Sequence, residues 1–105
     1  MALHHLHAGE KVRLPSPRSS DAKTSAFVKT DRFEAVQLVL HARDEIAPHS
    51  VPGYATLLCL EGAVTLRCPE DIYLETREWL YLDRGQRHSV TAIEDSLLLM
   101  TILFD

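Results

Sequence analysis

Residues 48–62, PHSVPGYATLLCLEG, decide which fold to expect. A histidine and two prolines open the stretch, and the apolar run YATLLCL follows before a glutamate and a glycine. A short apolar run between Gly and Pro signals is typical of a β-strand. The run does not alternate between apolar and polar residues, which indicates that both faces of this strand are covered.

Short apolar runs between turn signals also occur on both sides of this stretch. From Phe33 onward, short runs rich in branched and aromatic residues alternate with turn signals: EAVQLVLH, AVTLRC, IYLET, REWLYLD, SVTAIED and SLLLMTILF. No segment offers twelve residues with a helical period. The sequence therefore predicts one all-β domain, a sandwich or a barrel.

The N-terminal part differs from the rest. Residues 16–25, SPRSSDAKTS, have the composition of a loop, and the apolar residues Val12 and Leu14 allow at most one short strand before it. We therefore expect an N-terminal arm over residues 1–27 and a barrel over residues 28–105. His4, His5 and His7 fall in the arm, and the sequence assigns them no role.

Composition excludes several classes of protein. The 105 residues are 46% hydrophobic and 25% charged, which is typical of one globular domain. The net charge of −4 comes without a cluster of basic residues, so we expect no nucleic-acid partner. No apolar run is long enough to cross a bilayer and no secretory signal is recognisable, which predicts a cytoplasmic protein without membrane contact.

The two cysteines are expected to be free thiols. If Glu61 and Gly62 turn a hairpin, Cys59 faces Val64, and Cys68 faces Ala55, so the two sulfurs are far apart. Free thiols suit a reducing compartment.

Two runs, YATLLCL and SLLLMTILF, are apolar on both faces. The arm, a second subunit or both must cover their outer side, and we favour a homodimer; central strands with chance apolar outer positions are the alternative. Trp79 and Tyr81 alternate with Leu80 and Leu82, so one pair faces inward and the other outward. Aromatic residues on the outer face would suit an interface, but such residues are more often part of the core, and we favour core here.

Residues 28–105 resemble the small single-domain cupins. The first motif of that family runs G-x5-H-x-H-x(3,4)-E-x6-G. In this sequence His49 stands at its first histidine and Gly62 at its last glycine. Val51 takes the place of the second histidine, Ala55 that of the glutamate and Arg43 that of the leading glycine.

The second cupin motif, G-x5-P-x-G-x2-H-x3-N, matches in part as well. Gly85 and His88 stand at the right spacing. Asp83 replaces the proline, Ala92 the asparagine and Arg77 the leading glycine. The resemblance implies a single jelly-roll barrel (double-stranded β-helix) whose lumen contains His49 and His88.

Cupins usually hold one divalent metal through three histidines and the glutamate, and this sequence has two of those four ligands. A catalytic zinc normally takes three protein ligands, and a non-haem iron takes two histidines and a carboxylate. We therefore predict no firmly held metal, with a weakly bound Zn, Fe, Mn or Ni at His49 and His88 as the alternative.

Three functions stay open. The favoured one is a cupin of no assignable reaction whose lumen binds a small polar or anionic molecule through His49 and His88, with Tyr54, Arg84 and Arg87 as further ligand-binding residues. The arginines flank Gly85 and would favour a carboxylate or phosphate, although they could equally be ordinary surface residues. The second is a metal-dependent dioxygenase or isomerase, and the third is an accessory barrel that acts through protein contacts. Because no nucleophile or carboxylate partner is visible, binding is favoured over catalysis.

Overall fold

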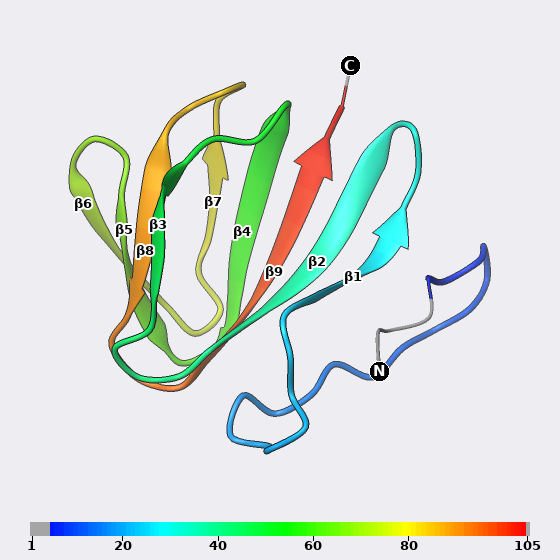
Figure 1. Ribbon diagram of the computed structural model, residues 1–105, viewed down its shortest axis with the longest axis horizontal. Helices are drawn as coiled ribbons and strands as arrows, with labels where there is room; N and C mark the ends of the chain where they lie inside the picture. The colour runs from blue at the N-terminus through cyan, green and yellow to red at the C-terminus, as the bar shows by residue number, and fades with distance from the viewer. Residues whose placement is uncertain (1–4, 105) are drawn as a thin grey trace.

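The protein is a two-layer β-structure, seen here in a computed structural model that describes residues 5–104 (Figure 1). Nine strands and no helix occur in that range. The strands are β1 Ser25–Lys29, β2 Phe33–Leu40, β3 Glu45–His49, β4 Tyr54–Glu61, β5 Ala63–Arg67, β6 Asp71–Glu75, β7 Trp79–Leu82, β8 His88–Ala92 and β9 Ser96–Leu103.

The strands form two antiparallel sheets that face each other. The five-stranded sheet has the order β1-β2-β9-β4-β7, and the four-stranded sheet has the order β3-β8-β5-β6. Strands that are neighbours in a sheet are often distant in the chain, as in a jelly roll. The predicted all-β jelly-roll class is therefore confirmed.

Alternation along the strands builds the core between the two sheets. In β4, Ala55, Leu57 and Cys59 are fully buried, whereas the residues between them are only half-buried. Strands β2 and β5 to β9 contribute buried residues to the same core, because successive side chains in a strand point to opposite faces. The inward set includes Leu38, Leu40, Val64, Leu66, Leu74, Leu82, Val90, Ala92, Leu98, Met100 and Ile102.

The prediction of a hairpin at Glu61 and Gly62 is wrong. β4 pairs with β7 and β9, and β5 pairs with β6 and β8, so the chain passes from one sheet to the other at Gly62. Gly62 has a φ of +100°, and a Cβ at this position would collide with Ser96. This corner therefore requires glycine. Cys59 and Cys68 are free and buried, as expected.

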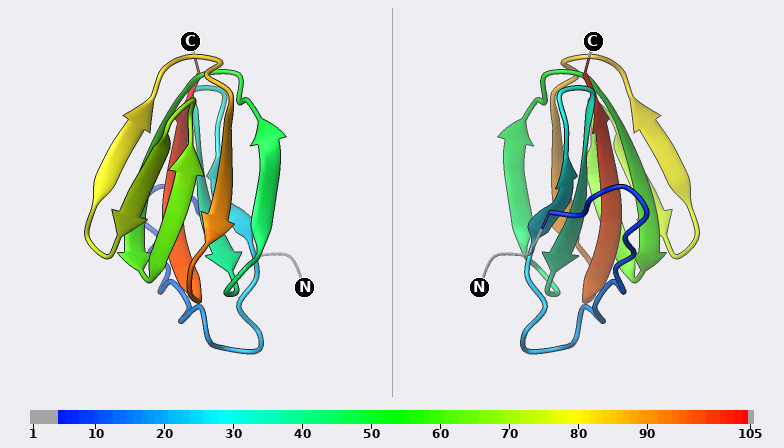
Figure 2. Two further views of the ribbon diagram at one scale, coloured as in Figure 1. Left: turned by 90° about the vertical axis from the view of Figure 1, so that its left-hand side faces the viewer. Right: turned by 90° about the vertical axis from the view of Figure 1, so that its right-hand side faces the viewer.

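The N-terminal arm lies on the outer face of the five-stranded sheet. In the right-hand view of Figure 2 the segment before β1 crosses in front of β9 on that face. Thr24 exchanges hydrogen bonds with the backbone of Val39, and Gln37 Nε2 donates to the carbonyl of Lys23 at 2.8 Å. Pro17 is fully buried. The arm thus covers part of the outer face of the five-stranded sheet, for which the apolar runs predicted a cover.

The ends of the arm are fixed by further contacts. Arg18 forms an ion pair with Glu61 at the far end of β4 (2.7 Å), and the amide of Leu6 donates to the carbonyl of Phe27. The strand β1 crosses the predicted boundary at residues 27 and 28, and Val12 and Leu14 lie outside any strand. Nowhere in residues 5–104 is there a helix that could span a membrane.

Candidate functional site

His49 and His88 are brought together by strand pairing. They end β3 and begin β8, and they are directly opposite each other in the register of these two strands. Their ring centroids are 4.4 Å apart, and the ring planes are tilted by 55°. Residues nearly forty positions apart in the chain therefore form one site, as the partial motifs predicted.

Both rings are held in one orientation by the backbone. His49 Nδ1 lies 3.0 Å from the carbonyl oxygen of Ala47, and His88 Nδ1 lies 3.1 Å from that of Gln86. A carbonyl oxygen can only accept, so each Nδ1 carries the proton. In the neutral ring, Nε2 is then a hydrogen-bond acceptor.

The two histidines differ in burial. His88 is 2% exposed, whereas His49 is half-buried. Burial lowers the pKa of His88 below its ordinary value; the hydrogen bond to the Gln86 carbonyl opposes this, and His49 adds to the lowering. His88 is therefore a neutral imidazole at neutral pH, which means that it offers an acceptor rather than a positive charge.

The histidines lie at the wall of a cavity of about 320 Å³ between the sheets. The other lining residues are almost all apolar and come from both sheets: Leu38, Leu40, Ile46, Leu57, Val90 and Met100, with Thr24 from the arm. Cavities of this size and character accommodate small molecules. The two imidazoles, together with Thr24, are thus the polar side chains of an otherwise apolar cavity wall.

The residues at the site do not fit a firmly bound metal. Ala55, at the glutamate position of the motif, is fully buried and has no donor atom, and Val51 supplies none either. Across residues 5–104 no three His, Cys, Asp or Glu side chains gather as a metal site would require. Two imidazoles are fewer donors than a catalytic zinc takes from its protein.

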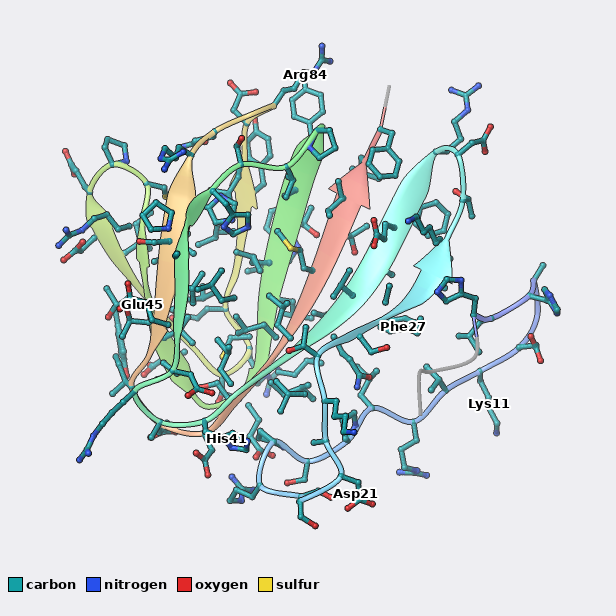
Figure 3. All side chains as sticks on the ribbon, in the orientation of Figure 1. Lys11, Asp21, Phe27, His41, Glu45 and Arg84 are labelled. Carbon is teal, nitrogen blue, oxygen red and sulfur yellow. The ribbon has the colours of Figure 1, made fainter. Side chains whose placement is uncertain are left out.

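Tyr54 and Arg84 lie away from the histidine pair. Tyr54 precedes the inward-facing Ala55, so its side chain belongs to the outer face of the sheet, and its ring centroid is 6.3 Å from that of Tyr81. The guanidinium of Arg84 stacks over the Tyr54 ring at 5.0 Å. Figure 3 shows Arg84 at the end of the barrel opposite to His41.

Arg87 lies close to the site but on another surface. It lines a second hollow of about 290 Å³ with Pro48, Arg67, Pro69, His88 and Ser89. Only His88 is common to this hollow and to the cavity between the sheets. A negatively charged group near His88 would therefore meet Arg87 outside the barrel rather than in the lumen.

The remaining histidines lie outside the lumen. His41 follows β2, is exposed, and has its Nδ1 3.9 Å from a carboxylate oxygen of Asp95. His5 and His7 are exposed in the arm, and His4 lies outside the described residues.

Sequence reasoning found the two histidines but missed the apolar lining. Leu57 and Met100 were assigned only to strands, and Thr24 only to the arm. The alternation within β4 and β9 would have identified the inward positions once the pairing of these strands was known.

Several solved structures share this fold. A conserved protein of unknown function from Streptococcus pyogenes superposes with a TM-score of 0.80 at 17% identity, and 100% of this chain and 96% of that chain are covered. A cupin superfamily protein from Desulfitobacterium hafniense gives 0.79 at 14%, covering 100% of both chains. An RmlC-like cupin from Desulfovibrio desulfuricans gives 0.68 at 23%, covering 98% and 96%.

At these identities the likeness shows the fold alone. No protein-family model matches the sequence, and no curated protein matches it. The fold expected from the partial motifs is confirmed: the chain has the all-β jelly-roll fold of these cupin structures.

Proposed function

We propose that the barrel binds a small, mainly apolar molecule in its lumen, and that His49 and His88 hold a hydrogen-bond donor of that molecule. The observation that carries the proposal is the cavity of about 320 Å³ in which these two imidazoles are the main polar groups. A ligand pocket with apolar walls and a few fixed polar groups is the usual design of a small-molecule site.

The chemistry of the ligand follows from the orientation of the rings. Because each Nδ1 donates to a backbone carbonyl, Nε2 is the ring nitrogen left to accept a hydrogen bond from a molecule in the cavity that both residues line. A hydroxyl, phenol or amine N–H would satisfy these acceptors, whereas a carboxylate or phosphate would require a protonated ring. The proposal therefore keeps the small molecule expected from the sequence but replaces its expected polar or anionic character with an apolar body and a donor group.

A binding protein accounts for this site better than an enzyme does. The residues that surround the histidines are aliphatic, and a reaction would need a nucleophile, a second acid or base, or a metal with more ligands. A metal-dependent dioxygenase or isomerase and an accessory barrel remain the alternative predictions.

A thermal-shift screen tests the proposal. The panel contains phenols, cyclic alcohols and arylamines, with benzoate, phosphate and sugars for comparison. A ligand present at about 100 times its Kd stabilises the fold by about 2.7 kcal/mol, which raises Tm on the order of 10 °C in a domain of this size. We expect hydroxylated or amino compounds to give the largest shifts.

The variants His49→Ala and His88→Ala should reduce the shift, and His41→Ala is the matched control because His41 is exposed and outside the cavity. If only carboxylates and phosphate shift Tm, or if the shift is the same in all three variants, the lumen is not the binding site.

A further inference from the structure

The strand β7 is a free edge with aromatic residues on its outer face. It ends the five-stranded sheet, and within residues 5–104 it pairs only with β4. In both views of Figure 2 it forms one flank of the molecule. Trp79 and Tyr81 are 59% and 56% exposed, whereas Leu80 is half-buried and Leu82 is 2% exposed. The two aromatic residues thus face outward, next to an edge whose backbone groups lack a neighbouring strand.

The sequence around this edge is self-complementary when it is read in opposite directions. Residues 77–83 are Arg-Glu-Trp-Leu-Tyr-Leu-Asp. Counting outward from Leu80 in both directions gives first Trp79 and Tyr81, then two residues that differ, and then Arg77 and Asp83. At equal distances on the two sides of Leu80, the sequence therefore has two aromatic residues and, further out, two opposite charges.

We propose that a second copy of this chain pairs with β7 edge to edge, antiparallel, about a two-fold axis through Leu80. In a two-fold interface residue i meets residue j and j meets i, so every contact occurs twice. Trp79 of each copy would lie opposite Tyr81 of the other copy. Arg77, in the turn that precedes β7, would come near Asp83, which directly follows β7. Pairing of strand edges supplies main-chain hydrogen bonds, and the cross-strand aromatic and charge pairs supply specificity.

The charges and aromatic residues select this register over its neighbours. If one strand slid along the other by one residue, side chains that point to opposite faces would be paired. The registers that compete with this one are therefore shifted by two residues in either direction. One of these places Trp79 opposite Asp83 of the second copy. The other places Trp79 opposite Trp79 and Tyr81 opposite Arg77. Only the register centred on Leu80 joins both aromatic residues and both charges to suitable partners.

The surface beside the edge fits a second copy as well. On β4, Leu58 lies opposite Trp79 and is half-buried, and Tyr54 contacts Tyr81. An aromatic residue covers a large area with few rotatable bonds, which suits the centre of an interface. The arm lies on the other part of this outer face, beside β9 and β2, and leaves Trp79 and Tyr81 exposed (Figure 2).

Analytical ultracentrifugation over a wide concentration range tests the pairing. The wild-type chain should dimerise reversibly. Arg77→Asp and Asp83→Arg each convert two opposite-charge pairs into two like-charge pairs, so each should raise the dissociation constant about tenfold. The variant with both changes restores opposite charges across the interface and should dimerise like the wild type. Arg77 has a φ of 76°, which aspartate tolerates, so the first variant should keep the fold.

Cysteine substitutions at single positions test the register. At a two-fold axis only one residue lies opposite itself, and its Cα atoms come within the range of a disulfide. Leu80→Cys should therefore give a covalent dimer under mild oxidation. Trp79→Cys and Tyr81→Cys should not, because in this register each residue is displaced from itself by two positions, roughly 6.6 Å along the strand.

A wild-type chain that stays monomeric at all concentrations overturns the proposal. A dimer that is indifferent to both charge reversals, or one that cross-links through residue 79 or 81 but not 80, also overturns it.

Discussion

His88 gives a prediction about how stability depends on pH. Burial lowers the pKa of this imidazole in the folded chain below the ordinary value of 6.5. Below about pH 6.5 the unfolded chain therefore binds a proton that the folded chain does not. The stabilisation is complete above the unfolded pKa and is lost as pH falls, until the folded ring also takes up a proton.

The size of the effect has an upper limit set by the unfolded state. At pH 5 an unfolded histidine is about 1.5 pH units below its pKa, and each unit corresponds to about 1.4 kcal/mol, so His88 can remove up to about 2 kcal/mol of unfolding free energy. This is a large fraction of the stability of a small domain.

Urea unfolding at pH 8 and pH 5, at one ionic strength, measures the effect in the wild type and in His88→Leu. The variant should lose less stability between the two pH values than the wild type does. At pH 8 it should be destabilised by about 1–3 kcal/mol at most, because the Gln86 carbonyl loses its N–H donor. His41→Leu, a change at an exposed histidine, is the control and should behave like the wild type. Equal losses in the wild type and in His88→Leu would refute the account of a buried neutral ring.

Three further predictions concern the corner, the thiols and metal content. Gly62→Ala should lower the unfolding free energy by about 2 kcal/mol or more, because φ is +100° and the new Cβ would meet Ser96; a smaller loss in urea unfolding would show that the corner relaxes. Burial raises the pKa of Cys59 to about 11, so this thiol should react with an aromatic disulfide reagent only after unfolding, and rapid reaction of the native thiol would contradict its assigned burial. Elemental analysis of protein purified without chelator should find far less than one zinc, iron, manganese or nickel ion per chain; a stoichiometric ion that His49→Ala and His88→Ala both remove would establish a metal site.

The fold could be predicted because it depends on patterns that are local in sequence. Short runs of branched residues between Gly, Pro and Asp signals predicted the strands. The jelly-roll arrangement was implied by the resemblance to the cupin motifs, which His49, Gly62, Gly85 and His88 match. The alternation in β7 separated Trp79 and Tyr81 from Leu80 and Leu82, but the favoured interpretation of the two aromatic residues as core is wrong, because they are exposed.

The predictions failed where the position of a residue depends on pairing between strands that are distant in the sequence. A glycine between two apolar runs reads as a hairpin, but Gly62 joins strands of different sheets because β4 finds its partners in β7 and β9. Tyr54 was assigned to the ligand from its position next to the motif, yet a shift of one residue along a strand places a side chain on the opposite face. The apolar lining of the lumen depends on both sheets at once, so no single run reveals it.

The most direct test of the binding site is a crystal structure of the protein with the compound that raises Tm most. We expect density for that compound between Leu57 and Met100, with its hydroxyl or amine within about 3 Å of Nε2 of His49 or His88. Density in the outer hollow beside Arg67 and Arg87 instead, with the lumen empty, would contradict the account.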